Sequence, residues 1–301
     1  MAYYLRGTPT PRATDCEMAD FIEYQCLRSF SKCISITEVV DILGIVADNN
    51  DDDNDDVLTD SIQDSLSEID ERGVDSGHSY PFSADNNTIS LKPDVSEFNT
   101  IIYTFLLLAT REKENKVADG IDGTSIFEQL CSEVIKNYFG RNSHSFVFGT
   151  GAENSMGFKD KVKTLLKTLN IRGYRVRMPD RDTGHHQDGG VDVVAFIPFS
   201  DRNKGHFVAF GQCKTGTTWR SSTPPTSFCS DYIEPSVVFN PVIFYMVAES
   251  FSDTWEGVER NCSGLLFDRE RIMEFLPDKL PQDLLEKIKQ WNSAIIAKDN
   301  S

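Results

Sequence analysis

The chain has 301 residues, of which 39% are hydrophobic and 26% are charged, and its formal net charge is −17. This length allows one large or two modest domains, and the composition excludes a disordered or fibrous protein. Taken alone, the acidic total argues against a nucleic-acid partner.

The charge is unevenly distributed along the chain. Residues 48–75 contain twelve Asp and Glu with Arg72 as the single basic residue, whereas residues 159–181 contain eight Lys and Arg against Asp160 and Asp180. The basic segment is compatible with a local phosphate-binding patch in spite of the acidic total, and equally with a solvated helix face.

The cysteines and the apolar runs bear on the cellular compartment. Seven cysteines are scattered without a C-x-x-C pair, which favours reduced thiols over a disulfide framework or a zinc site. No charged-then-apolar leader opens the sequence, and the most apolar run, 101–109, is too short to cross a bilayer. We therefore expect a cytoplasmic protein with no membrane partner.

The first third of the chain is predicted to be mostly helical. A helix is expected from Thr14, which forms capping-box spacing with Glu17, to about Ser31, and a second over 35–44. Residues 80–91 have the pattern of a small hairpin. A third helix before the hairpin is indicated by apolar residues at near-helical spacing: Leu58, Ile62, Leu66 and Ile69.

Three helices followed by a hairpin is the order of a winged-helix domain, which commonly binds DNA. Here the third helix, which would enter the groove, is acidic and would be repelled by phosphate. The acidic residues are Asp60, Asp64, Glu68, Asp70 and Glu71. We therefore expect residues 1–118 to form an acidic interaction or regulatory domain, with a plain helical cap on the second domain as the alternative.

The second domain is expected to span 119–301. After a buried helix over 94–110 and a charged linker, a strongly amphipathic helix is predicted over 124–139, followed by a basic helix over 158–169. Strands are expected over 145–151, where a short strand runs into a glycine turn, and over 174–178, 191–196, 207–210, 242–247 and 264–267. Helices are expected over 268–275 and 282–297. This order predicts an α/β protein whose mixed sheet has helices on both faces.

Polar side chains stand at the ends of two neighbouring strands within residues 187–214. Asp192 follows Gly189-Gly190, and Gln212 and Lys214 are two apart, so a strand would point both toward the same face. Cys213, between them, would face the core, so a thiol nucleophile is not expected. Carboxylate and amide oxygens suit Mg²⁺, and a lysine can orient a bound water or neutralise charge on a phosphate.

The pattern Asp188-Gly189-Gly190-Val191-Asp192 followed by Gln212-Cys213-Lys214 resembles the PD-(D/E)XK, restriction-endonuclease-like superfamily. It is most similar to the Mrr-like branch, in which Gln replaces the usual Glu and a helix containing Phe-Glu precedes the strands. Phe127-Glu128 fits that place, with Glu133 as the reserve carboxylate. The resemblance covers roughly residues 124–215, and the 64 positions between Glu128 and Asp192 imply an inserted segment.

The resemblance implies a restriction-endonuclease-like core and a metal-dependent nuclease. Asp192, Gln212 and Glu128 would hold Mg²⁺ or Mn²⁺, and Lys214 would complete the catalytic set. It further implies a DNA substrate, with RNA left open, and a role in prokaryotic restriction or antiviral defence. The acidic domain beside such a nuclease suggests regulation by a protein partner or by homo-oligomerisation.

A second interpretation belongs to another functional class. The chain could be a catalytically silent subunit that keeps the nuclease fold and docks on a basic partner through its acidic N-terminal domain. Divalent-metal binding that depends on Asp192 distinguishes the two. An RNase on the same scaffold is the third interpretation, because phosphodiester chemistry needs the same residues for both substrates.

Overall fold

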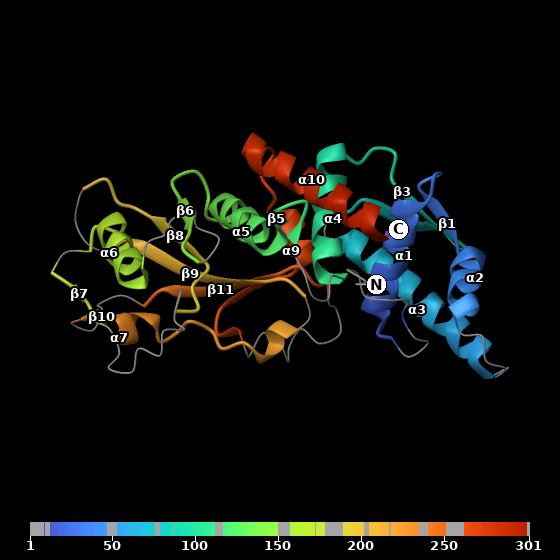
Figure 1. Ribbon diagram of the computed structural model, residues 1–301, viewed down its shortest axis with the longest axis horizontal. Helices are drawn as coiled ribbons and strands as arrows, with labels where there is room; N and C mark the ends of the chain where they lie inside the picture. Colours follow the sequence, from blue (N-terminus) through green and yellow to red (C-terminus); the bar gives the residue numbers. More distant parts are fainter. Residues whose placement is uncertain are drawn as a thin grey trace.

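The computed structural model describes residues 9, 13–46, 53–75, 79–85, 87–111, 117–149, 157–171, 173–177, 189–201, 205–216, 218–234, 240–250 and 262–299. It has a mixed α/β architecture (Figure 1), as predicted. The first elements form a helical module on one side of the molecule, and a mixed sheet with its helices occupies the other. Within the described residues, no helix is both long and apolar enough to cross a membrane.

The N-terminal module contains the three predicted helices and the hairpin. The helices are α1 (Asp15–Arg28), α2 (Ile36–Val46) and α3 (Asp53–Asp75), and the hairpin strands are β2 (Phe82–Asp85) and β3 (Thr88–Leu91). The capping box between Thr14 and Glu17 is present at the start of α1. A short strand that the sequence did not predict, β1 (Cys33–Ser35), pairs with β3, giving a sheet of order β1-β3-β2.

The remaining helices match the predicted segments closely, except between residues 215 and 234, where the sequence predicted no helix. They are α4 (Glu97–Arg111), α5 (Gly123–Phe139), α6 (Phe158–Thr168), α7 (Phe228–Tyr232), α9 (Arg269–Glu274) and α10 (Gln282–Asp299), with a short 3₁₀ helix η2 (Thr218–Ser221). Two minor antiparallel pairs accompany them: β4 (Val117–Ala118) with β5 (Ile121–Asp122), and β7 (Arg175–Val176) with β10 (Ile233–Glu234).

The main sheet is five-stranded, in the order β12-β11-β9-β8-β6. Its strands are β6 (His144–Val147), β8 (Val193–Ile197), β9 (Phe207–Lys214), β11 (Val242–Val247) and β12 (Leu265–Phe267). The strands β6, β8 and β9 pair antiparallel, whereas β11 is parallel to both β9 and β12. The parallel step from β9 to β11 needs a crossover connection, and α7 lies within it.

Alternation along the strands divides the sheet into two apolar faces. Ala209 and Cys213 pack into the core that also contains α5 and α10, whereas Val208 and Phe210 pack with α6 and α7. Both faces are thereby covered by helices, as predicted. Because side chains alternate along a strand, the α6/α7 face also receives those of Asp192, Gln212 and Lys214.

One core joins the N-terminal module to the helices of the sheet. Buried residues of α1, α3, α4, α5 and α10 belong to a single cluster that continues onto β9 and β11. Figure 1 shows α10 running from the sheet toward α1, and α10 packs on both α4 and α5. The boundary at 118/119 stays a prediction, and the packing continues across it.

A buried ionic cluster lies inside this junction. Arg269, at the start of α9, is 0% exposed and donates from two nitrogens to the two carboxylate oxygens of Asp20, at 2.8 and 2.9 Å. Arg72 of α3 donates to Asp20 at 2.8 Å and also to Glu23 and Glu68. Glu68, which the sequence suggested as part of an acidic surface, is therefore a buried structural partner.

Two tyrosines complete the environment of Glu23. Tyr80 donates to one of its carboxylate oxygens at 2.6 Å and Tyr103 to the other at 2.8 Å. Burial raises the pKa of Glu23, which the two arginines oppose. A buried carboxylate is costly unless it is paired and hydrogen-bonded, and here both conditions are met.

Replacing Arg269 with Met should destabilise the protein by about 3 to 5 kcal/mol, because Asp20 and Glu23 would keep buried charges without this partner. Chemical denaturation measures the change. The matched control is Lys163→Met, since the ion pair of Lys163 with Asp160 is exposed, with side chains 58% and 61% accessible. It should cost less than about 1 kcal/mol. Equal effects of the two substitutions would contradict a structural role for the cluster.

Glu270 makes stability depend on pH. Burial, with Asp268 adding, raises its pKa from 4.5 to about 8. Between these values the folded state holds a proton that the unfolded state releases, so stability falls as pH rises, by up to about 1.4 kcal/mol per pH unit. The neutral variant Glu270→Gln should lack this loss. Its stability relative to wild type should therefore grow from pH 5 to pH 8 in denaturation series, and a constant difference would contradict the assignment.

Candidate functional site

Asp192 is fixed at the point where the chain enters β8. Gly189 and Gly190 precede it with φ values of +62° and +79°, a left-handed turn that favours glycine. The backbone carbonyl of Asp192 accepts from Phe148 N–H at 2.7 Å and Gly149 N–H at 3.0 Å. Its side-chain Oδ2 accepts from the Cys213 amide at 2.8 Å. The carboxylate is thus positioned by both neighbouring strands, β6 and β9.

Three polar residues lie in a row across adjacent strands. Asp192 precedes Val193, which pairs with Gly211, and so stands beside Gln212. On the other side of β9, Gln212 pairs with Tyr245 of β11. Gln212 and Tyr245 are only 6% and 2% exposed, and within the described chain neither Gln212 Oε1 nor the Tyr245 hydroxyl has a hydrogen-bond partner.

Glu128 reaches the same place from α5. A Cβ built on Gly149 would lie 3.1 Å from Asp192 Oδ1 and 3.3 Å from Glu128 Oε2, so the two carboxylates converge on one point beside Gly149. Both carboxylates are buried. Glu133, the reserve candidate, is instead half-buried and pairs with Lys136 at 3.6 Å.

Two lysines approach this acidic pair. Lys214 Nζ lies 3.6 Å from Asp192 Oδ2, and its side chain is one-third exposed. Lys161 of α6 donates to the Gly149 carbonyl at 3.0 Å. Lys159, Lys163 and Lys167 are spaced by four residues and share another side of α6, where all three are exposed. Most of the basic helix is therefore a solvated face, and Lys161 alone of these lysines turns toward the site.

Several other side chains near the site serve packing. Cys213 is buried against Cys131, and burial raises the pKa of its thiol well above the usual range, so it is no nucleophile. Trp219 is buried and donates to Glu249 at 2.6 Å, with Arg220 over its ring and paired with the same carboxylate. Packing over the sheet, rather than base stacking, describes this pair. Position 188, which begins the Asp-Gly-Gly pattern, lies outside the described residues.

The donor set fits a hard divalent cation. Two buried carboxylates and an amide oxygen are oxygen ligands of the kind that Mg²⁺ prefers, and the unsatisfied Gln212 Oε1 lacks the partner that a buried acceptor requires. The described part of the chain contains no group of three or more His, Cys, Asp or Glu side chains that could hold a metal ion. A cation bound between the two carboxylates would therefore need the amide oxygen as its third protein ligand.

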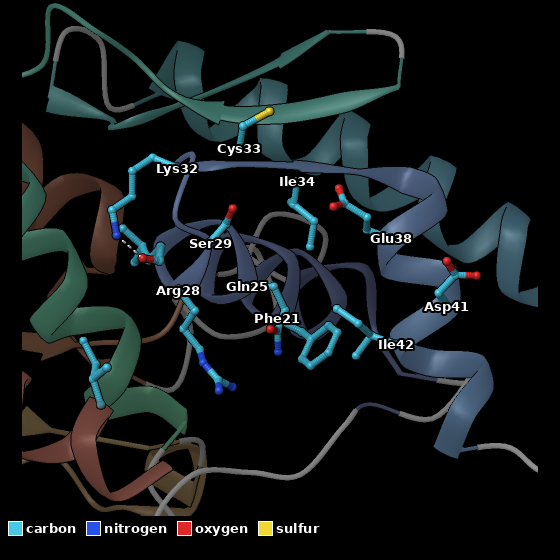
Figure 2. Close-up of a pocket in the computed structure, with 12 residues that line it drawn as sticks. Phe21, Gln25, Arg28, Ser29, Lys32, Cys33, Ile34, Glu38, Asp41 and Ile42 are labelled. Atoms are coloured by element: carbon cyan, nitrogen blue, oxygen red, sulfur yellow. Dashed lines mark hydrogen bonds between the residues drawn. The ribbon is translucent and has the colours of Figure 1, made fainter. Parts of the chain in front are cut away.

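A separate hollow of about 840 Å³ lies in the N-terminal module (Figure 2). Its apolar lining includes Phe21, Ile34 and Ile42, and its charged lining consists of Arg28, Lys32, Glu38 and Asp41. The hollow shares no residue with the row of Asp192, Gln212 and Tyr245. Its balanced charges give no preference for an anionic or a cationic ligand.

Comparison of the chain with protein-family models, with curated proteins and with solved structures finds no match.

Sequence reasoning missed three residues that the fold brings to this place. Gly149 lies in a glycine turn, which by itself gives no sign of a nearby site, and Lys161 is one of several lysines on a basic helix. Tyr245 lies within an apolar strand, where a tyrosine gives no signal of its own. Only the register of β11 against β9 places it next to Gln212.

Gly149→Ala should weaken divalent-cation binding about tenfold to hundredfold, because its methyl group would enter the space between Asp192 and Glu128. The φ of Gly149 lies outside the left-handed region, so alanine can adopt its conformation, although the added Cβ would also lie 3.2 Å from the Cα of Asp192 and press on that residue. Calorimetric titration with Mn²⁺ measures the effect. Gly157→Ala is the matched control, since a Cβ there meets nothing within 4 Å. Unchanged affinity in Gly149→Ala would show that no cation binds between the carboxylates.

Proposed function

We propose that the chain is a metal-dependent nuclease that hydrolyses phosphodiester bonds, with Glu128, Asp192, Gln212 and Lys214 as its site. The observation that carries the proposal is that Glu128 and Asp192 meet beside Gly149, with Lys214 3.6 Å from Asp192 and the unpartnered Oε1 of Gln212 on the adjacent strand. Helix, Asp-bearing strand and Gln-x-Lys strand follow in the order that the resemblance to the Mrr-like branch implies.

Asp192, Glu128 and Gln212 would hold Mg²⁺ or Mn²⁺ through oxygen atoms. The bound cation supplies Lewis acidity to a phosphate oxygen and lowers the pKa of a water molecule. Because Gln212 is neutral, the site contains two carboxylates rather than three, which favours one cation over two.

Lys214 has a distinct part in this chemistry. Its ammonium is near enough to Asp192 to be oriented by that carboxylate, yet its side chain remains one-third exposed. A lysine in this position can hold the attacking water or donate to the oxygen on which charge develops as the P–O bond breaks. The net result is addition of water across the phosphodiester, leaving a phosphomonoester and a hydroxyl.

We place DNA first as the substrate and RNA second, and a role as an effector in prokaryotic anti-phage defence rests on the resemblance alone. The competing function is a catalytically silent interaction subunit in such a complex. The exposed acidic side chains of α3, Asp64, Asp70 and Glu71, favour a basic protein partner for the N-terminal module in either case.

The test is incubation of the protein with supercoiled plasmid, and in parallel with a structured RNA, in Mg²⁺ or Mn²⁺. Wild type should nick the plasmid, EDTA should abolish nicking, and Lys214→Ala and Asp192→Asn should each lower the rate about a hundredfold or more.

The matched control is Lys167→Ala, which removes an exposed lysine from the outer side of α6 and should leave the rate close to that of wild type. Cleavage that survives Lys214→Ala would show that other residues carry the reaction. If wild type neither cleaves DNA or RNA nor binds Mn²⁺, the interaction subunit is the correct interpretation.

A further inference from the structure

Tyr245 carries a hydroxyl group in a buried position where no described residue bonds to it. Its side chain is 2% exposed, its ring packs near Trp219, and its hydroxyl has no hydrogen-bond partner within the described chain. A buried hydroxyl without a partner costs free energy, and a phenylalanine would fill the same space without that cost. The hydroxyl therefore calls for a partner that the described residues do not supply.

The position of Tyr245 indicates what that partner contacts. It is the register partner of Gln212, whose Oε1 is the other unsatisfied atom of the row, and both side chains lie on the α6/α7 face. The two strands are parallel and adjacent, so side chains in register stand about 5 Å apart. A ligand small enough to sit over β9 can meet both.

The chemistry of the two atoms is complementary. Gln212 Oε1 can only accept, which suits a cation, whereas a phenol can donate. Burial, with the nearby Cys262 and Asp192 adding, raises the pKa of Tyr245, so the phenol keeps its proton at neutral pH. It is thus a hydrogen-bond donor and neither a base nor a nucleophile. A phosphate group suits both atoms, because its oxygens bind divalent cations and also accept hydrogen bonds.

We propose that the Tyr245 hydroxyl donates a hydrogen bond to a phosphate oxygen of the ligand bound over β9, beside the cation-binding Gln212. This assignment rests on the proposed phosphodiester chemistry and adds to it a catalytic residue that the sequence pattern does not contain. No proton leaves Tyr245 in this role. The hydrogen bond fixes the phosphate relative to Asp192 and Lys214.

Tyr245→Phe tests the assignment because it removes one oxygen atom and leaves the packing intact. Loss of the donor should lower plasmid cleavage about tenfold to hundredfold at saturating Mg²⁺, the effect of a hydrogen bond to a charged group. Loss of an unsatisfied buried hydroxyl should at the same time raise the Tm of the ligand-free protein by about 2 to 4 °C. The two changes have opposite directions, which a merely structural tyrosine would not produce.

The matched control is Tyr103→Phe. Tyr103 is also fully buried, but its hydroxyl is satisfied by Glu23 at 2.8 Å. Its loss should lower the Tm and leave cleavage per folded molecule unchanged. If Tyr245→Phe also lowers the Tm and leaves cleavage unchanged, an internal partner such as a bound water satisfies the hydroxyl, and the assignment is wrong.

A binding measurement separates this inference from the proposed function. Affinity for a fluorescein-labelled oligonucleotide is measured in Ca²⁺ for wild type and Tyr245→Phe. Weaker binding by the variant supports the phosphate contact even where wild type cleaves nothing, in which case hydrolysis alone is wrong. Cleavage by wild type with equal cleavage and binding by Tyr245→Phe overturns the Tyr245 assignment and leaves the nuclease proposal standing.

Discussion

The bidentate contact between Arg269 and Asp20 is the interaction on which the arrangement of the two halves depends. Arg269 begins α9 directly after β12, and its Nε also donates to the carbonyl of Ala248 at the end of β11. The same guanidinium therefore holds the end of the sheet and the first helix of the chain. Buried charges stabilise little by themselves, because desolvation offsets their attraction. The ion pairs instead favour this one docking of the N-terminal module, because a different docking would leave buried charges without partners.

Two hydrogen bonds connect Arg269 to the end of β9, which carries part of the candidate site. Ala248, which accepts from Arg269, donates its N–H to the carbonyl of Lys214 at 3.3 Å. The last residue of β9 is thus held by the segment that carries the ionic cluster. Alternate residues of β9 point to opposite sides of the sheet. Cys213 joins the α5 core, while Gln212 and Lys214 join the polar row.

The sequence predicted the parts of the molecule that depend on local pattern. Periodicity identified the helices and the main strands, and the spacing of Gln212 and Lys214 placed both on one face. It did not predict what depends on long-range register. Arg269 and Asp20 are 249 positions apart, and Glu68 looks like one more exposed acid in an acidic helix. Tyr245 is similarly unmarked within its apolar strand, and β1, with three residues, is too short to carry a period.

Buried polar groups are hydrogen-bonded in the ionic cluster but not all of them are at the candidate site. Every carboxylate of the ionic cluster has a donor, and Glu23, the most enclosed, accepts from both tyrosines as well as Arg72. Among the described residues, three buried side-chain atoms lack partners, and two of them, Gln212 Oε1 and the Tyr245 hydroxyl, are neighbours. The third, Asn292 Oδ1, belongs to a side chain whose amide nitrogen is anchored to the Ile101 carbonyl. A chain that satisfies five buried charged residues at one junction can satisfy a hydroxyl and an amide. Their pairing on adjacent strands beside two carboxylates is the observation that the proposed ligand would explain.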